Sequence, residues 1–94
     1  MPEFSELTII WTDYLKYRAS IRQFDLAKIE HIIRHSSERY FDIETRRSIA
    51  IGRHDEQLVM IPYDADNDTI TPVTIHVTTR QQIQFRLRTG RFTT

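Results

Sequence analysis

Several side chains that can hold a phosphate or move a proton gather in the second half of the chain. His76 lies on a predicted strand, on the face away from its apolar residues, and Arg80 follows at the start of a predicted helix. An imidazole exchanges protons near neutral pH, and a helix N-terminus favours anions. The pair predicts a site that cleaves RNA through the adjacent 2′-hydroxyl without a metal ion. The alternative is a polar sheet face with a solvated histidine.

The same region supplies further candidates. Tyr63 ends the preceding strand, so we group it with His76 and Arg80 as catalytic. Eleven of the 13 basic residues are arginines, and residues 69–94 contain four arginines and no acid. Arginine grips phosphate with two parallel hydrogen bonds, which suits an RNA backbone or an acidic partner. The predicted RNA-binding residues are Arg53, Arg86, Arg88 and Arg91. A solvated helix rich in arginine is the alternative.

Metal and cofactor sites have little support in the sequence. His31 and His35 stand four apart on a predicted helix, a spacing that zinc sites use, but they fall opposite the apolar side of that helix and lack a third ligand. The chain has no cysteine, no glycine-rich phosphate loop and no serine flanked by glycines. We therefore expect neither a metal nor a cofactor.

The composition points to one small domain. The chain has 94 residues, 13 acidic and 13 basic side chains, and 39% apolar residues. We expect a single domain over residues 1–94 with an ordered core over about 7–90, and a partner or a second copy that adds burial. No long apolar run predicts a membrane span, and no leader is evident, so a cytoplasmic location is expected.

The periodicity predicts the elements that position these side chains. A short strand at 7–11 precedes a helix over 14–22 and a second helix over 26–33, which we expect to form a helical hairpin. Strands over 40–43, 48–53, 57–63 and 70–77 then form a four-stranded antiparallel meander, and a helix runs from 79 to 87. The class is α+β, with one sheet face buried on the helices and the other open, carrying Thr74 and His76.

Two short segments add a resemblance to a known family. Residues 12–25 read T-D-Y-x-x-x-R-x-x-x-R-Q-F-D, and residues 73–80 read V-T-I-H-V-T-T-R. With the order of elements, they resemble small bacterial toxins of the RelE-like or BrnT-like superfamily, including a family that opens T-x-H-x3-R-x3-R-G. Tyr14 stands where that family has His, and Gln82 where the BrnT-like helix has Glu.

The resemblance implies a function and a partner. Proteins of this kind are metal-independent endoribonucleases of toxin–antitoxin modules, neutralised by a small antitoxin protein. When the sequence is matched to the family's motif by position, Arg80 corresponds best to a functional residue of the family, and His76 corresponds less securely. A second hypothesis is a non-catalytic protein of the same fold that binds a partner or dimerises.

Overall fold

A computed structural model of the chain describes residues 4–94. The elements follow in the order η1 (Phe4–Glu6), β1 (Thr8–Ile9), α1 (Asp13–Arg22), α2 (Leu26–His35), β2 (Glu38–Asp42), β3 (Arg47–His54), β4 (Gln57–Ala65), β5 (Thr69–Pro72), β6 (His76–Val77), α3 (Arg80–Arg88) and β7 (Phe92–Thr93). The α+β class and the three main helices agree with the sequence prediction.

Each main helix begins at a residue whose side chain caps its first turn. The side chain of Thr12 accepts a hydrogen bond from Leu15 N, and that of Thr79 accepts one from Gln82 N, both at 3.1 Å. Asp25 serves α2 in the same way. Such oxygens satisfy N–H groups that have no partner inside the helix.

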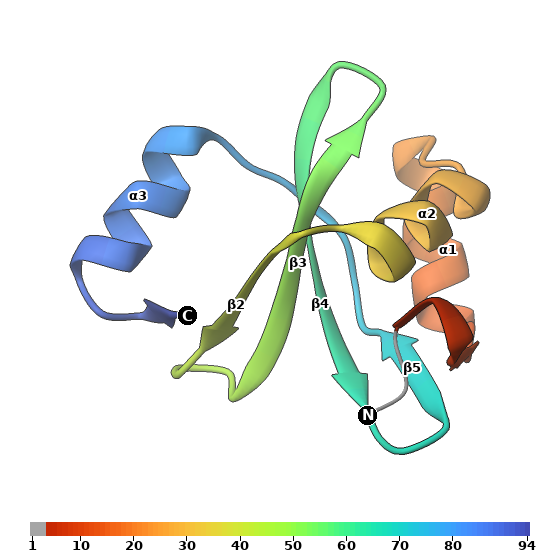
Figure 1. Ribbon diagram of the computed structural model, residues 1–94. Helices are drawn as coiled ribbons and strands as arrows, with labels where there is room; N and C mark the ends of the chain where they lie inside the picture. The colour runs from red at the N-terminus through yellow and green to blue at the C-terminus, as the bar shows by residue number, and fades with distance from the viewer. Residues whose placement is uncertain (1–3) are drawn as a thin grey trace.

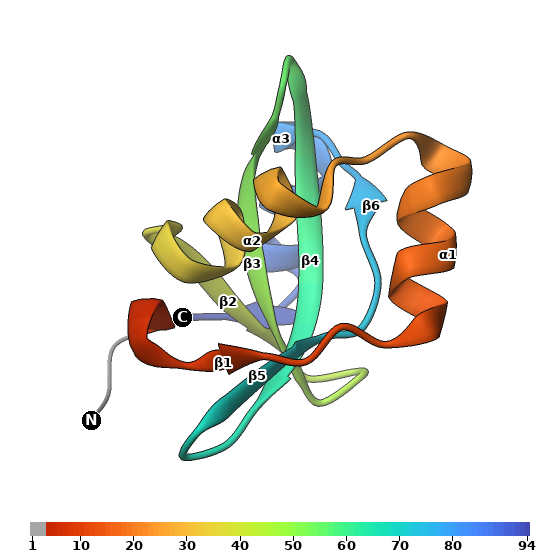
Figure 2. The same cartoon turned by 90° about the vertical axis from the view of Figure 1, so that its right-hand side faces the viewer.

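The two N-terminal helices do not lie side by side as a hairpin. Gln23 ends α1 in the left-handed conformation, with φ of 61°, and turns the chain sharply before α2. Figure 2 shows the two helices running in clearly different directions. Only Leu15 and Ala19 of α1 are buried, whereas α2 buries Ile29, Ile32 and Ile33. The helix α2 therefore packs on the sheet, and α1 extends past its edge.

The sheet is larger and more mixed than the predicted four-stranded meander. It has seven strands in the order β1-β5-β4-β3-β2-β7, with β6 also paired to β4. The central β2–β3–β4 meander is antiparallel as expected, but β1 pairs with β5 in parallel. The strands β1, β6 and β7 have two residues each, too few to show a period of two in the sequence.

The predicted last strand, 70–77, is divided by a bulge. Pro72 lies opposite Tyr63 and His76 opposite Met60, so three residues of this segment face two of β4. One extra residue changes which side chains alternate inward. Val77 is 47% exposed, although it lies opposite the buried Val59. His76 shares the face of Met60, because directly opposed residues point to the same side.

Both faces of the sheet are covered, which corrects the expectation of one open face. Figure 1 shows α3 on one side of the strands and α1 and α2 on the other. On the α2 side, Ile29, Ile33 and Ala50 are among the buried residues of one cluster. On the other side, Ile83 and Phe92 pack with strand residues in a second cluster. On that face a small pocket lies beside His76.

Gly52 lets α2 approach β3 closely. A Cβ built on Gly52 would lie 2.7 Å from Cγ2 of Ile32, a separation that packed atoms do not tolerate. We expect Gly52→Ala to lower the free energy of unfolding by about 1–2 kcal/mol through overpacking. Urea denaturation measures this loss. In an Ile32→Ala background, which removes the clashing atoms, the same change should cost less, and equal costs in both backgrounds would contradict the explanation.

Candidate functional site

His76 is held by an arginine from a distant part of the chain. Its Nδ1 lies 3.1 Å from Nη2 of Arg18, whose Nε donates to the carbonyl oxygen of Ile75 at 3.2 Å. A guanidinium only donates hydrogen bonds, so Nδ1 is the acceptor and the ring proton is assigned to Nε2. Figure 2 shows α1, which carries Arg18, running beside β6. The ring is thus neutral and fixed in orientation.

The surroundings of His76 favour that neutral form. Its pKa lies below the usual 6.5, first because the ring is partly buried and then because Arg18, Arg22 and Arg86 place positive charge near it. Arg18 and Arg22 come from α1, and Arg86 comes from α3. An anion that enters this cluster meets three guanidinium groups and a neutral imidazole. Such an arrangement suits a phosphate.

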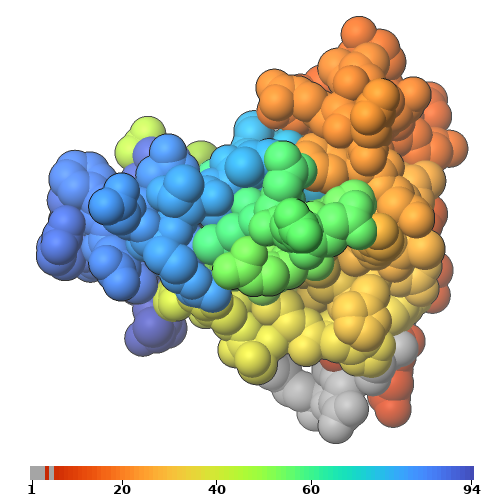
Figure 3. Space-filling view, turned by 90° about the horizontal axis from the view of Figure 1, so that it is seen from above, coloured from red at the N-terminus to blue at the C-terminus, as the bar shows by residue number. Residues whose placement is uncertain are grey.

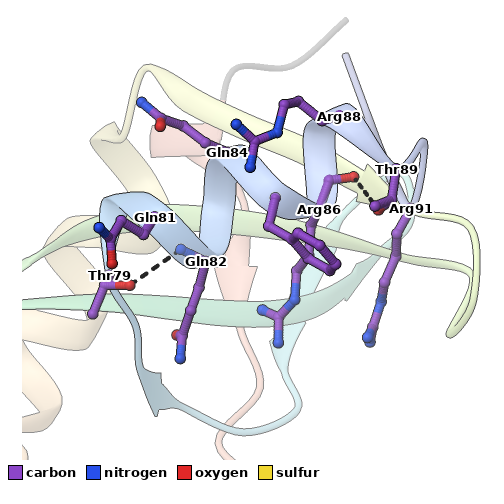
Figure 4. Close-up of a pocket in the computed structure, with 9 residues that line it drawn as sticks. Thr79, Gln81, Gln82, Gln84, Arg86, Arg88, Thr89 and Arg91 are labelled. Carbon is purple, nitrogen blue, oxygen red and sulfur yellow. Dashed lines mark hydrogen bonds between the residues drawn. The ribbon is translucent and has the colours of Figure 1, made fainter.

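Arg86 reaches this region from α3. Its Nη1 lies 3.2 Å from Sδ of Met60, the residue opposite His76, and its guanidinium lies 5.5 Å from the centre of the Phe92 ring. Figure 4 shows Arg86 and Arg91 extending to the same side of α3, while Arg88 extends to the other. Of the predicted RNA-binding arginines, Arg86 therefore lies near His76, and Arg91 lines a pocket that His76 also lines.

Arg80 occupies the predicted place at the start of α3, but not beside His76. Its Nη1 lies 2.6 and 2.8 Å from the carboxylate oxygens of Glu38 on β2. It borders a separate hollow of about 400 Å³, together with Arg53, His31 and His35. From above, the β3–β4 turn (green) lies between α3 (blue) and the helical segment in orange and yellow (Figure 3). His76 lines a different pocket from the hollow that Arg80 and Arg53 line.

Tyr63 and Arg91 have partners of their own. Tyr63 is only 4% exposed and belongs to the cluster that faces α2, with its ring 5.8 Å from that of Phe4. It points away from the face of His76, and the structure does not bring the two together. Arg91 donates to both carboxylate oxygens of Asp42, at 3.1 and 3.2 Å, and so anchors the C-terminal segment.

The buried Asp42 is ionised by its partners. Burial acts most strongly and would raise the pKa of this carboxyl, which is 2% exposed. The hydrogen bonds from Arg91 and the backbone of Glu44 and Thr45 outweigh that effect, and the pKa lies below its usual value. Arg91 therefore stabilises the fold in this structure. Arg88 is exposed on α3.

The sequence prediction omits Arg18 and Arg22 from the site. Both belong to the T-D-Y-x3-R-x3-R segment, and their spacing of four places them on the same side of α1. That spacing is the signal that could have included them. Contact between Arg18 and His76, which are 58 residues apart, depends on the sheet and the bend after α1. The helix α1 therefore contributes to the site, which the sequence places on the sheet face and the last helix.

The structure offers no support for a metal at the histidine pair. His31 and His35 are exposed, with ring centres 4.9 Å apart. Within residues 4–94, no group of three or more histidines and carboxylates is placed to hold a metal ion. In the same part of the chain, no helix has the length and apolar character needed to cross a membrane.

Comparison of the chain with models of protein families, with curated proteins and with solved structures finds no match. The function of the site therefore has to be inferred from its own geometry.

Proposed function

We propose that the protein is a metal-independent endoribonuclease whose site is centred on His76. The supporting observation is the neutral, half-buried imidazole hydrogen-bonded to Arg18 and surrounded by Arg22 and Arg86. A neutral imidazole accepts a proton, and guanidinium groups stabilise the negative charge that develops on phosphorus oxygens. These are the two requirements for cleavage of RNA by its own 2′-hydroxyl.

The reaction requires Arg18 to change partners. A phosphate is a stronger acceptor than a neutral imidazole, so an arriving phosphodiester draws the Arg18 guanidinium from Nδ1 of His76. The freed Nδ1 accepts the proton of the 2′-hydroxyl, and the resulting oxygen attacks phosphorus. The bond to the 5′-oxygen breaks, and that oxygen takes a proton from water. The products are a 2′,3′-cyclic phosphate and a free 5′-hydroxyl.

A non-catalytic binding or dimerising role is the second candidate. One observation favours it: the outer side of α1 exposes three large side chains, Tyr14, Tyr17 and Ile21. The partner in this role is a small antitoxin protein or a second copy of the chain. In addition, Arg80 and Arg91 are paired with carboxylates. This pairing fits a protein that does not bind RNA through these two side chains.

Cleavage in the presence of a chelator separates the two candidates. The purified protein should cut a single-stranded RNA in excess EDTA and leave 2′,3′-cyclic phosphate ends, because the scheme uses no metal. The same strand with 2′-deoxyribose throughout should remain intact, since it lacks the nucleophile. Gel electrophoresis and mass spectrometry of the fragments identify the ends. Cleavage of neither strand would favour the non-catalytic role.

A further inference from the structure

A small pocket lies directly beside His76. It has a volume of about 170 Å³, and Ile49, Met60 and Pro62 supply apolar surface to its lining. Pockets that enclose drug-sized ligands are usually about 300–1,000 Å³. This one therefore has room for a single ring rather than a whole nucleotide.

The charged residues at the pocket are already neutralised. Arg91 is paired with Asp42, and Arg47 lies 3.3 Å from a carboxylate oxygen of Asp64. Both arginines line the pocket. Paired guanidinium groups remain planar and can stack on a ring, but they have less charge to offer an anion. The pocket therefore favours a neutral planar group, whereas the cluster of Arg18, Arg22 and Arg86 favours a phosphate.

One polar group in the pocket wall has no partner. The Thr74 hydroxyl is buried, and no hydrogen bond to it exists among the described residues. A buried hydroxyl without a partner is costly, so its presence in the wall of a pocket points to a ligand that completes it. A hydroxyl both donates and accepts, and so can pair with the ring nitrogen of either uracil or cytosine.

We propose that this pocket binds the pyrimidine base of the nucleotide whose phosphate meets His76 and Arg18. The inference rests on the proposed function and deepens it by naming the preferred substrate, RNA with a pyrimidine at the cleaved position. Ile49 and Met60 contact the ring, and Thr74 pairs with its edge. His76 borders both the pocket and the arginine cluster, so it lies between base and phosphate.

Binding of mononucleotides to the wild-type protein tests the proposal without a variant. Calorimetry or NMR titration compares cytidine and uridine 3′-monophosphate with the adenosine and guanosine forms and with ribose 5-phosphate. The pyrimidine nucleotides should bind about tenfold more tightly than ribose 5-phosphate, which is a modest share of what base stacking typically provides. The purine nucleotides should bind no better than ribose 5-phosphate.

Thr74→Val then tests the hydroxyl, because it removes the oxygen and keeps the shape. It should weaken binding of the pyrimidine nucleotides and leave the affinity for ribose 5-phosphate unchanged, because the apolar contacts with the ring remain. The matched control is Thr71→Val on β5, outside the pocket, which should keep the preference.

Each of the other possible outcomes contradicts a specific part of the proposal. Equal binding of all probes, or tighter binding of the purine nucleotides, would refute the pyrimidine pocket. Either result would leave the proposed phosphate site unaffected. Failure of every probe to bind, ribose 5-phosphate included, refutes the proposed function as well.

Discussion

Replacement of His76 by Ala is expected to lower the rate of RNA cleavage by about 10²–10⁴-fold, the usual contribution of a general base. The proton of the 2′-hydroxyl then has no acceptor, while Arg18, Arg22 and Arg86 still hold the phosphate. Single-turnover cleavage of a fluorescent RNA measures the effect. His31→Ala is the matched control, because that histidine is exposed and lies in the separate hollow. Equal rates for His76→Ala and wild type would show that the base lies elsewhere.

The pH dependence of kcat/KM provides a second test of the same residue. A base must be unprotonated, so the rate should rise with pH through the pKa of His76 and level off above it. Because that pKa lies below 6.5, the rise should be complete near neutral pH. Arg18→Gln removes one nearby positive charge while burial remains, so the rise should move to higher pH. An unchanged profile would contradict the contact between the two residues.

Loss of the Arg91 guanidinium is expected to destabilise the fold strongly. In Arg91→Gln the buried Asp42 loses the cation that compensates its burial. Breaking a buried ion pair typically costs about 3–5 kcal/mol, and because Arg91 is partly exposed we expect about 2–3 kcal/mol. Urea denaturation measures the loss. Arg88→Gln, which changes an exposed arginine of α3, should have little effect and serves as the control.

Acid should weaken the wild-type protein through the same pair. The pKa of Asp42 is lower in the folded protein than in the unfolded chain. The pair therefore stabilises the fold above the unfolded value of about 3.9, and this contribution disappears as the pH falls through the folded pKa. Asp42→Asn should make stability less sensitive to pH in that range. If the two proteins lose stability in parallel below pH 4, Asp42 is not the group responsible.

The parts of the fold predicted from sequence are those governed by local chemistry. The capping of the helices by Thr12, Asp25 and Thr79 and the apolar spacing of α2 involve only neighbouring residues, and the three main helices are confirmed. The central meander has strands long enough to show alternation. The bulge before His76, the parallel pairing of β1 with β5 and the burial of both sheet faces depend on contacts between distant segments, which periodicity does not contain.

The candidate site also has features that the sequence predicts and features that depend on contacts between distant segments. The place of His76 on a strand is enough to identify it as a candidate, and its partial burial and neighbouring arginines give it a suitable setting. Tyr63 is misplaced by the sequence, because alternation along β4 does not reveal which side α2 covers. Arg80 is assigned to catalysis from its place at a helix start, and Arg91 to RNA binding from its charge, although Glu38 and Asp42 lie beside them in the fold. Charge in the sequence does not reveal which carboxylate an arginine will meet.

The two edges of the sheet affect how readily the protein aggregates. Each edge is closed by a strand of two residues, β1 at one side and β7 at the other. Short edge strands offer few unpaired N–H and C=O groups to another molecule, which protects against edge-to-edge association. Detachment of β7 would uncover β2, whose Phe41 is already exposed, and create a longer edge open to pairing. Conditions that loosen the Arg91–Asp42 anchor should therefore promote self-association before global unfolding.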